Sequence, residues 1–199
     1  MDGITKQTQQ WVARDARMSF FCAPISNKLP AGEVSLFQVY DYIRGFEAKS
    51  RTLCLRNIKD KDEQRGFKGW QLDYVTPSGT FAYCNDGGLK MHSGIICMDL
   101  DELNDVKVMK QRLLNDPYWG EKTLLLFTSP RGNGLKWFLP IDIDKYEHRV
   151  WFNAIRNYLM KTYSLSDKQV DPACSNLSRA CWLCHDPEVY LKAELYEHF

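Results

Sequence analysis

Hydrophobic and polar positions alternate along the chain in blocks that predict a mixed fold of strands and helices. The clearest block covers residues 95–101, Ile-Ile-Cys-Met-Asp-Leu-Asp, which is apolar on both faces until it reaches two aspartates. Such a run is typical of a strand in the interior of a sheet. Further strands are predicted at residues 18–23, 122–128 and 135–140.

Apolar residues at helical spacing predict three amphipathic helices. The first covers residues 36–44 behind the N-cap Ser35, and the second follows Asn104 or Asp105 as N-cap and extends to about Asn115. The longest covers residues 145–163 behind Asp144, which is a favourable N-cap residue. Helices of this length with one apolar face are expected to pack against a sheet.

Shorter segments complete the expected order of elements. Residues 52–56 predict a short strand, residues 60–68 a solvated helix or loop, and residues 179–185 a last strand. Residues 72–84 predict a hairpin, because a Pro-Ser-Gly turn separates two apolar runs. The fold class expected from the whole pattern is α+β, with helices against a largely antiparallel sheet.

Length, net charge and cysteine content limit the possible domain organisation and cellular environment of the protein. With 199 residues, 44% of them hydrophobic, the chain fits a polar N-terminal arm at residues 1–17 and a single domain at residues 18–199. A formal net charge of +1 gives no chain-wide signal for nucleic-acid binding, so any basic groove must be local. Seven cysteines, no apolar signal segment and no membrane-length run predict a reduced, cytoplasmic protein with mostly free thiols and no membrane partner.

The aspartates of the central run are the first candidates for chemistry. Because strand side chains alternate, Asp99 and Asp101 are expected on the same side. Two adjacent carboxylates repel each other unless a cation lies between them, and Mg²⁺ or Mn²⁺ prefers oxygen ligands. The alternative is one buried, hydrogen-bonded aspartate and one helix cap.

A glycine-rich turn is the second candidate. Its glycines and asparagine favour positive φ and backbone N–H groups that face a phosphate, while its arginine and the following lysine supply positive charge. A lysine within a strand also marks a solvated face or an edge, which is the competing interpretation. The string is not a P-loop, because the following element is a strand. The candidate phosphate-binding residues are Ser129, Arg131, Gly132, Asn133, Gly134 and Lys136.

Two further patterns lie near the C-terminus. Asp171 is held extended by Pro172 and is either a third metal-binding carboxylate or a simple turn residue. A C-x6-C-x2-C-H string also occurs, but zinc usually takes two separated ligand pairs, and a haem-attachment string without a secretory signal is best explained as coincidence. Buried free thiols are therefore favoured over zinc for this string. Its members are Cys174, Cys181, Cys184 and His185.

Taken in order, these motifs resemble the three-motif pattern of the archaeo-eukaryotic primase superfamily, the primase–polymerases. Four segments, at residues 76–81, 92–101, 129–137 and 170–179, resemble the primase-like domain grouped with the VirE N-terminal family of mobile elements and phages. That family often precedes a helicase domain. The resemblance covers residues 18–192.

The resemblance implies an RRM-like catalytic core with an N-terminal α/β unit. It also implies synthesis of primers or DNA from nucleoside triphosphates on a single-stranded DNA template, in a bacterial or phage-infected cell, with a helicase domain or protein as a partner. Asp99, Asp101 and Asp171 would hold two ions, Mg²⁺ or Mn²⁺, and Arg179 would join the turn residues at the nucleotide. Most of that superfamily has histidine where this chain has Lys136. A lysine can still bind phosphate through its positive charge, but it is a poorer proton donor than histidine near neutral pH.

Two other functions remain open from the sequence. One is a catalytically silent, RRM-like module that binds single-stranded nucleic acid through exposed aromatics such as Phe81, Trp137 and Phe138. The other is a metal-dependent nuclease that uses the same carboxylates. RNA or DNA as product, and new priming or extension alone, are also left open.

Overall fold

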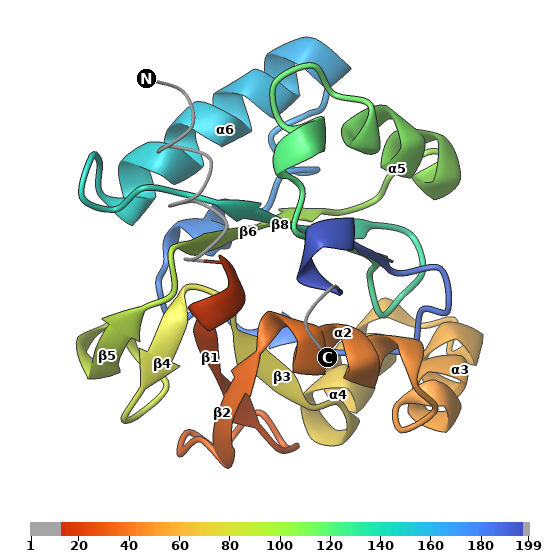
Figure 1. Cartoon of the computed structure of the whole chain (residues 1–199). Coiled ribbons are helices and arrows are strands. Elements are labelled where there is room, and N and C mark those ends of the chain that lie inside the picture. The colour runs from red at the N-terminus through yellow and green to blue at the C-terminus, as the bar shows by residue number, and fades with distance from the viewer. Residues whose placement is uncertain (1–12, 197–199) are drawn as a thin grey trace.

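A computed structural model describes residues 13–196 (Figure 1). Two four-stranded sheets and one two-stranded sheet are formed, and all of their strand pairs are antiparallel. The α+β prediction of helices against largely antiparallel sheet is therefore confirmed. Of the predicted arm, residues 1–12 lie outside the described part, whereas Ala13 and Ala16 are buried and Arg17 opens the first strand.

The central sheet has the strand order β10-β7-β8-β6. Its strands are β6 (Ile95–Leu100), β7 (Leu125–Thr128), β8 (Leu135–Pro140) and β10 (Tyr190–Leu191). The first three were expected from their apolar runs, and β10 was not. It is only two residues long, so no periodicity identifies it in the sequence.

The two faces of the central sheet pack into different cores. Ile96, Met98 and Leu100 pack with α5 (Val106–Leu114) and α6 (His148–Tyr163). Ile95 and its neighbours on the other face pack with α2 (Leu36–Arg44) and the N-terminal strands. In Figure 1, α5 and α6 lie on one side of β6 and β8, and α2 lies on the other. Cover on both faces explains why this strand is apolar at every position before Asp99.

The N-terminal sheet has the order β2-β1-β3-β9. It comprises β1 (Arg17–Phe21), β2 (Gly32–Ser35), β3 (Tyr74–Thr76) and β9 (Cys181–Trp182). The predicted hairpin at residues 72–84 is wrong, because β3 pairs with β1 while β4 (Gly79–Phe81) pairs with β5 (Leu89–His92). Only tertiary pairing decides which of several adjacent strands become partners.

Two of the three predicted helices begin and end close to where their caps place them. Ser35 and Gln38 form a reciprocal capping box at the start of α2, and the Asp105 side chain accepts from Val108 N–H at the start of α5. The longest helix, α6, begins at His148 rather than behind Asp144. Its cap residue, Glu147, makes no side-chain cap, so the local sequence carried little information about that start.

The strand predicted at residues 52–56 is wrong. These residues lie in α3 (Lys49–Asn57), where Thr52 and Leu55 are buried three positions apart, as on one face of a helix. Residues 60–68, predicted as solvated helix or loop, belong to α4 (Lys61–Gln71), which begins at the N-cap Asp60 and has no buried residue. A five-residue apolar run fits either element, and packing decided between them.

Candidate functional site

A buried ion pair between Asp99 and Lys136 lies at the centre of the candidate site. The two residues are directly opposite each other on β6 and β8, and the Lys136 ammonium donates to Asp99 Oδ2. Both residues are buried, at 5% and 6% exposed. Burial alone would lower the pKa of Lys136, but the Asp99 carboxylate raises it well above its usual value. Lys136 is therefore a buried cation in the sheet interior, not part of a solvated face or edge.

Asp171 lies directly beside this pair. Residues 169–171 run antiparallel to the end of β6, with a bridge between Val170 and Leu100. The Asp171 N–H donates to the Asp99 carbonyl at 3.0 Å, and the Asp101 N–H donates to the Gln169 carbonyl at 2.9 Å. A segment 70 residues away in sequence thus brings a third carboxylate to the two on the central strand.

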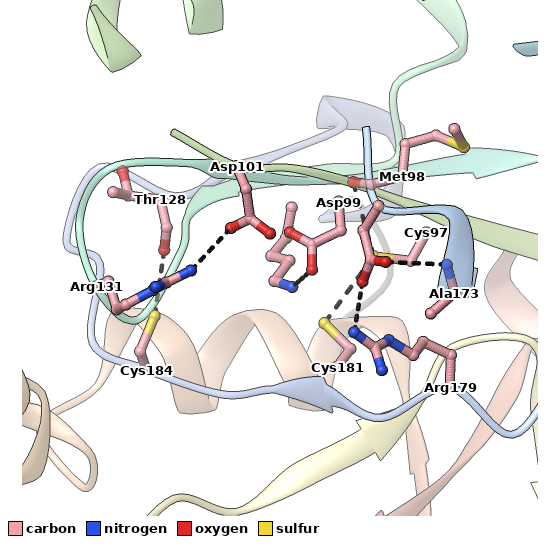
Figure 2. Close-up of polar contacts among 12 residues, drawn as sticks. Cys97, Met98, Asp99, Asp101, Thr128, Arg131, Ala173, Arg179, Cys181 and Cys184 are labelled. Carbon is pink, nitrogen blue, oxygen red and sulfur yellow. Dashed lines mark hydrogen bonds and ion pairs between the residues drawn. The ribbon is translucent and has the colours of Figure 1, made fainter. Parts of the chain in front are cut away.

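Each of the other two carboxylates is paired with an arginine. Arg131 approaches Asp101 at 3.5 Å, and Arg179 donates to Asp171. Figure 2 shows Asp99 and Asp101 on the same side of the β6 ribbon, with Arg131 and Arg179 arriving from opposite sides. Burial, and then the neighbouring Asp99 carboxylate, raises the pKa of Asp101. The predicted cluster of acidic and basic residues is thus present.

The turn at residues 129–134 is well fixed. The Ser129 and Gly132 N–H groups donate within the turn, to the Gly134 and Ser129 carbonyls, both at 2.9 Å. The prediction that the turn's N–H groups face a phosphate is therefore wrong for these two. Gly132 has a φ of 83°, and a Cβ on Gly134 would overlap the Leu100 carbonyl, so both glycines have a structural reason.

Three buried polar atoms at the site have no hydrogen-bond partner within residues 13–196. They are Asp99 Oδ1, Ser129 Oγ and Asn133 Oδ1. Leaving a buried polar atom unpaired costs about 1–3 kcal/mol, so such atoms are rare away from functional sites. A carboxylate oxygen is an acceptor for a cation, and a hydroxyl can donate to a phosphate. These orphaned atoms fit a site whose ligands are a metal ion and a phosphate.

The sequence did not identify several residues that belong to the site. Lys68 on α4 and Trp182 on β9 line the cleft with Asp99, Asp101 and Arg131. Burial, followed by repulsion from Lys136 and Arg131, lowers the pKa of Lys68 to about 8. No motif contains Lys68, because it reaches the cleft only through the packing of α4 beside the central sheet. The sequence offered one indication of this role: Lys68 lies on a helix that buries none of its residues.

Arg56 on α3 is the second missed contributor. Its guanidinium donates to the Pro130 carbonyl at 3.1 Å and to the Ser129 carbonyl at 3.3 Å. It thereby holds the turn from the N-terminal side of the molecule. The prediction of a strand at residues 52–56 concealed this role, because a helix presents Arg56 on a different face from a strand.

The cysteine–histidine string does not form one site. Cys181 lies 4.0 Å from Cys97 between sulfur atoms, the Cys184 thiol donates to the Thr128 carbonyl at 3.2 Å, and His185 Nδ1 lies 2.7 Å from the Gly45 carbonyl oxygen. Cys174 instead lies with Asp99 and Asp171, and the three ligand atoms are within 4.8 Å of one another. Among residues 13–196 this trio is the one group of three possible metal ligands.

The aromatic residues proposed for base stacking are not available for it. Phe81, Trp137 and Phe138 are each at most 1% exposed. The Trp137 indole N–H donates to Thr123 at 2.8 Å inside the core. The prediction that these aromatics are exposed was wrong, because a strand covered on both faces has no solvent-facing positions.

No helix within residues 13–196 combines the length and the apolar character needed to cross a membrane.

Comparison with known proteins corrects the expected family. The sequence model of the family described as BT4734-like, N-terminal domain, matches residues 69–191. No curated protein and no solved structure matches the chain. The predicted membership of the primase–polymerases and the VirE N-terminal family is therefore wrong. Its four motifs were short, and carboxylates after a strand with a glycine-rich turn suit many phosphate and metal sites. Since the match spans more than half of its 199 residues, the chain belongs to the BT4734-like N-terminal domain family.

Proposed function

We propose that this protein is a metal-dependent nucleotidyltransferase that uses nucleoside triphosphates. The observation that carries the proposal is that Asp99 and Asp171, from two chain segments, have carboxylate oxygens within 4.8 Å of each other. Asp101 and four cationic side chains line the same cleft as Asp99. Carboxylates in this arrangement are suited to two divalent ions, Mg²⁺ or Mn²⁺, which would activate an attacking hydroxyl and neutralise the leaving pyrophosphate.

The charge balance of the site supports a polyanionic substrate. Four basic side chains line the cleft, against Asp99 on β6, Asp101 directly after the end of β6, and the neighbouring Asp171. Two divalent ions would add four positive charges. A triphosphate with its four negative charges balances such a site better than a single phosphodiester does. The basic residues are Lys68, Arg131, Lys136 and Arg179.

The ion pairs suggest how the site changes when it is loaded. Lys136, Arg131 and Arg179 each neutralise a carboxylate in the structure. A divalent ion on the carboxylates would replace them and free these side chains for phosphate oxygens. The unpaired Ser129 hydroxyl lies in the same cleft and would donate to the same group. The free space, about 50 Å³, holds ions and a few waters but no nucleotide, so the lining side chains are expected to move.

The order of elements supports the RRM-like core as part of this proposal. Along the chain, β6, α5, β7, β8 and α6 are followed by the bridge at Val170, a β-α-β-β-α-β order. In space, Val170 neighbours β6, which neighbours β8 and then β7. Both helices pack on one face, and Asp99 lies on the other. In this arrangement, the sheet face away from the helices carries the chemistry.

The direct test is metal-dependent incorporation of a labelled nucleotide on a primed single-stranded DNA template. Ribonucleotides and deoxynucleotides should be assayed in parallel, with Mg²⁺, Mn²⁺ or a chelator. We expect Asp171→Asn to abolish incorporation. The matched control is Asp167→Asn, which changes an exposed aspartate four residues away that pairs with Arg156.

The alternative functions have distinct outcomes in the same assay. Shortening of the DNA would replace the proposal with a metal-dependent nuclease. Unchanged DNA length, together with metal-independent DNA binding in both variants, would replace it with a silent binding module. With two divalent ions bound, the charge of the cleft suits a triphosphate better than the single phosphodiester of a nuclease substrate. The aromatics expected to stack on bases in a binding module are buried.

A further inference from the structure

Cys174 occupies a position that the proposed chemistry does not require. It lies in a short 3-10 turn, Pro172–Ser175, which is capped by Asp171. The Asp171 side chain accepts from the N–H of the second turn residue, Ala173, at 2.9 Å. This turn places the thiol within 4.8 Å of a carboxylate oxygen of Asp99 and of Asp171. The residue is 6% exposed. A thiol is thus directed at the same point as two carboxylates.

Asp99 carries an unpaired buried acceptor, which indicates a position for a cation. Asp99 is 5% exposed, and its Oδ1 is buried without any hydrogen-bond partner in the described part of the chain. Its other oxygen is occupied by Lys136. A buried carboxylate oxygen without a donor is costly, and a cation bound there would satisfy it. The trio therefore has an independent sign of a ligand besides the proximity of its members.

The chemistry of the three donors differs from that of an ordinary magnesium site. Mg²⁺ takes oxygen ligands in near-octahedral geometry, whereas thiolate ligands select softer cations. Zn²⁺ and Co²⁺ accept carboxylate and thiolate ligands together, at about 2.0–2.2 Å for oxygen and about 2.3 Å for sulfur. Three ligand atoms within 4.8 Å of one another can reach such distances with small side-chain shifts.

We propose that Cys174 is a metal ligand together with Asp99 and Asp171, and that this position takes a thiophilic divalent cation in preference to Mg²⁺. On binding, the thiol releases its proton to solvent and the sulfur coordinates the ion as thiolate. This inference deepens the proposed function and changes it at one of the two ions, which would be a thiophilic cation in place of Mg²⁺.

The test is binding of Co²⁺ alone to the full chain, without nucleotide or DNA. Thiolate coordination gives a sulfur-to-cobalt charge-transfer band in the near ultraviolet, which carboxylate coordination does not. The exposed Cys22 and Cys54 should first be replaced by serine, so that they cannot bind the probe. We expect the band in this background and its loss in Cys174→Ser, with Co²⁺ affinity falling by about tenfold or more.

Matched variants separate ligation from a packing role. Cys97→Ser and Cys181→Ser change the neighbouring pair of thiols and should keep the band. Cys174→Asp should shift the preference from Zn²⁺ toward Mg²⁺ in competition titrations, because it restores an all-oxygen set. Loss of the band in Cys97→Ser and Cys181→Ser as well as in Cys174→Ser would overturn the assignment. Persistence of the band in Cys174→Ser would also overturn it.

The result is distinguishable from failure of the proposed function. Absence of nucleotide incorporation together with a Cys174-dependent cobalt band would reject the transferase and retain the mixed-ligand site. Incorporation in Mg²⁺ that is unchanged in Cys174→Ser, together with no cobalt band, would retain the transferase and reject Cys174 as a ligand.

Discussion

Two aspartates with the same exposure have opposite surroundings. Asp99 and Asp116 are each 5% exposed. Asp116 Oδ1 accepts from two backbone N–H groups at 2.8 and 2.9 Å, and its Oδ2 accepts from the Tyr158 and Tyr163 hydroxyls at 2.9 and 2.5 Å. Asp99 has one oxygen on Lys136 and the other without a partner.

The difference shows that burial alone does not identify a functional carboxylate. Asp116 is fully satisfied, so it fixes the end of α5 against α6 and leaves no capacity for a ligand. Asp99 lies near two further carboxylates, and its unpaired oxygen costs free energy unless a donor or a cation binds it. Unsatisfied hydrogen-bonding capacity, combined with converging charges, is the better indicator of a site.

The largest expected contrast is in catalysis. Asp99→Asn should reduce nucleotide incorporation by roughly 10³-fold or more, because a catalytic metal supplies several kcal/mol of transition-state stabilisation. Asp116→Asn should leave the rate per folded molecule within about threefold of wild type, since Asp116 has no free acceptor for an ion. Rates should be normalised to the folded fraction measured by circular dichroism. An equal loss of nucleotide incorporation in both variants would show that the unpaired oxygen of Asp99 has no special role in catalysis.

The next contrast is in stability. Asp116→Ala removes the carboxylate that accepts from two tyrosine hydroxyls and two N–H groups. It should lower the free energy of unfolding by about 3 kcal/mol. Replacing the other pair together, Asp99→Leu with Lys136→Met, should be neutral or stabilising, because an apolar pair avoids the desolvation of two charges. Urea unfolding of both variants measures the difference. A double variant less stable than Asp116→Ala would contradict this account.

A smaller effect is expected for the lysines of α4. Lys68 lines the cleft, whereas Lys61 on the same helix is exposed and pairs with Glu102 at 2.8 Å. Lys68→Met should raise the KM for the nucleotide about tenfold, which corresponds to about 1.4 kcal/mol from one charge-assisted contact. Lys61→Met should leave KM unchanged. If both variants behave alike, the helix contributes only general positive charge.

The smallest expected effect is on the pH dependence of stability at Asp116. Burial alone would raise the pKa of Asp116, but donors from Tyr163, the following backbone N–H groups and Tyr158 lower it below the usual value. The stabilisation is therefore present above the unfolded pKa of about 3.9 and is lost as the pH falls through the folded pKa. Unfolding of Asp116→Asn should depend less on pH between about pH 6 and about pH 3 than unfolding of wild type. The charged Arg112 near Tyr163 is unchanged in both proteins.

Much of the central sheet could be predicted because its signals are local. The run ending at Asp99 is apolar on both faces, the turn before β8 carries its own glycines, and Ser35 and Asp105 cap their helices through side chains within three residues. Each of these features depends on neighbours in sequence. Short segments such as α3 and β10 were missed because a few residues carry too little periodicity to choose an element.

The sequence by itself determined that two carboxylates share one side of a buried strand and that Lys136 follows a tight turn. Only the tertiary structure decided that Asp171 lies beside them, that Cys174 joins the trio and that Lys68 lines the cleft. The reason is physical. Alternation along a strand is set by adjacent residues, whereas contacts between distant segments depend on which strands pair and which faces are buried.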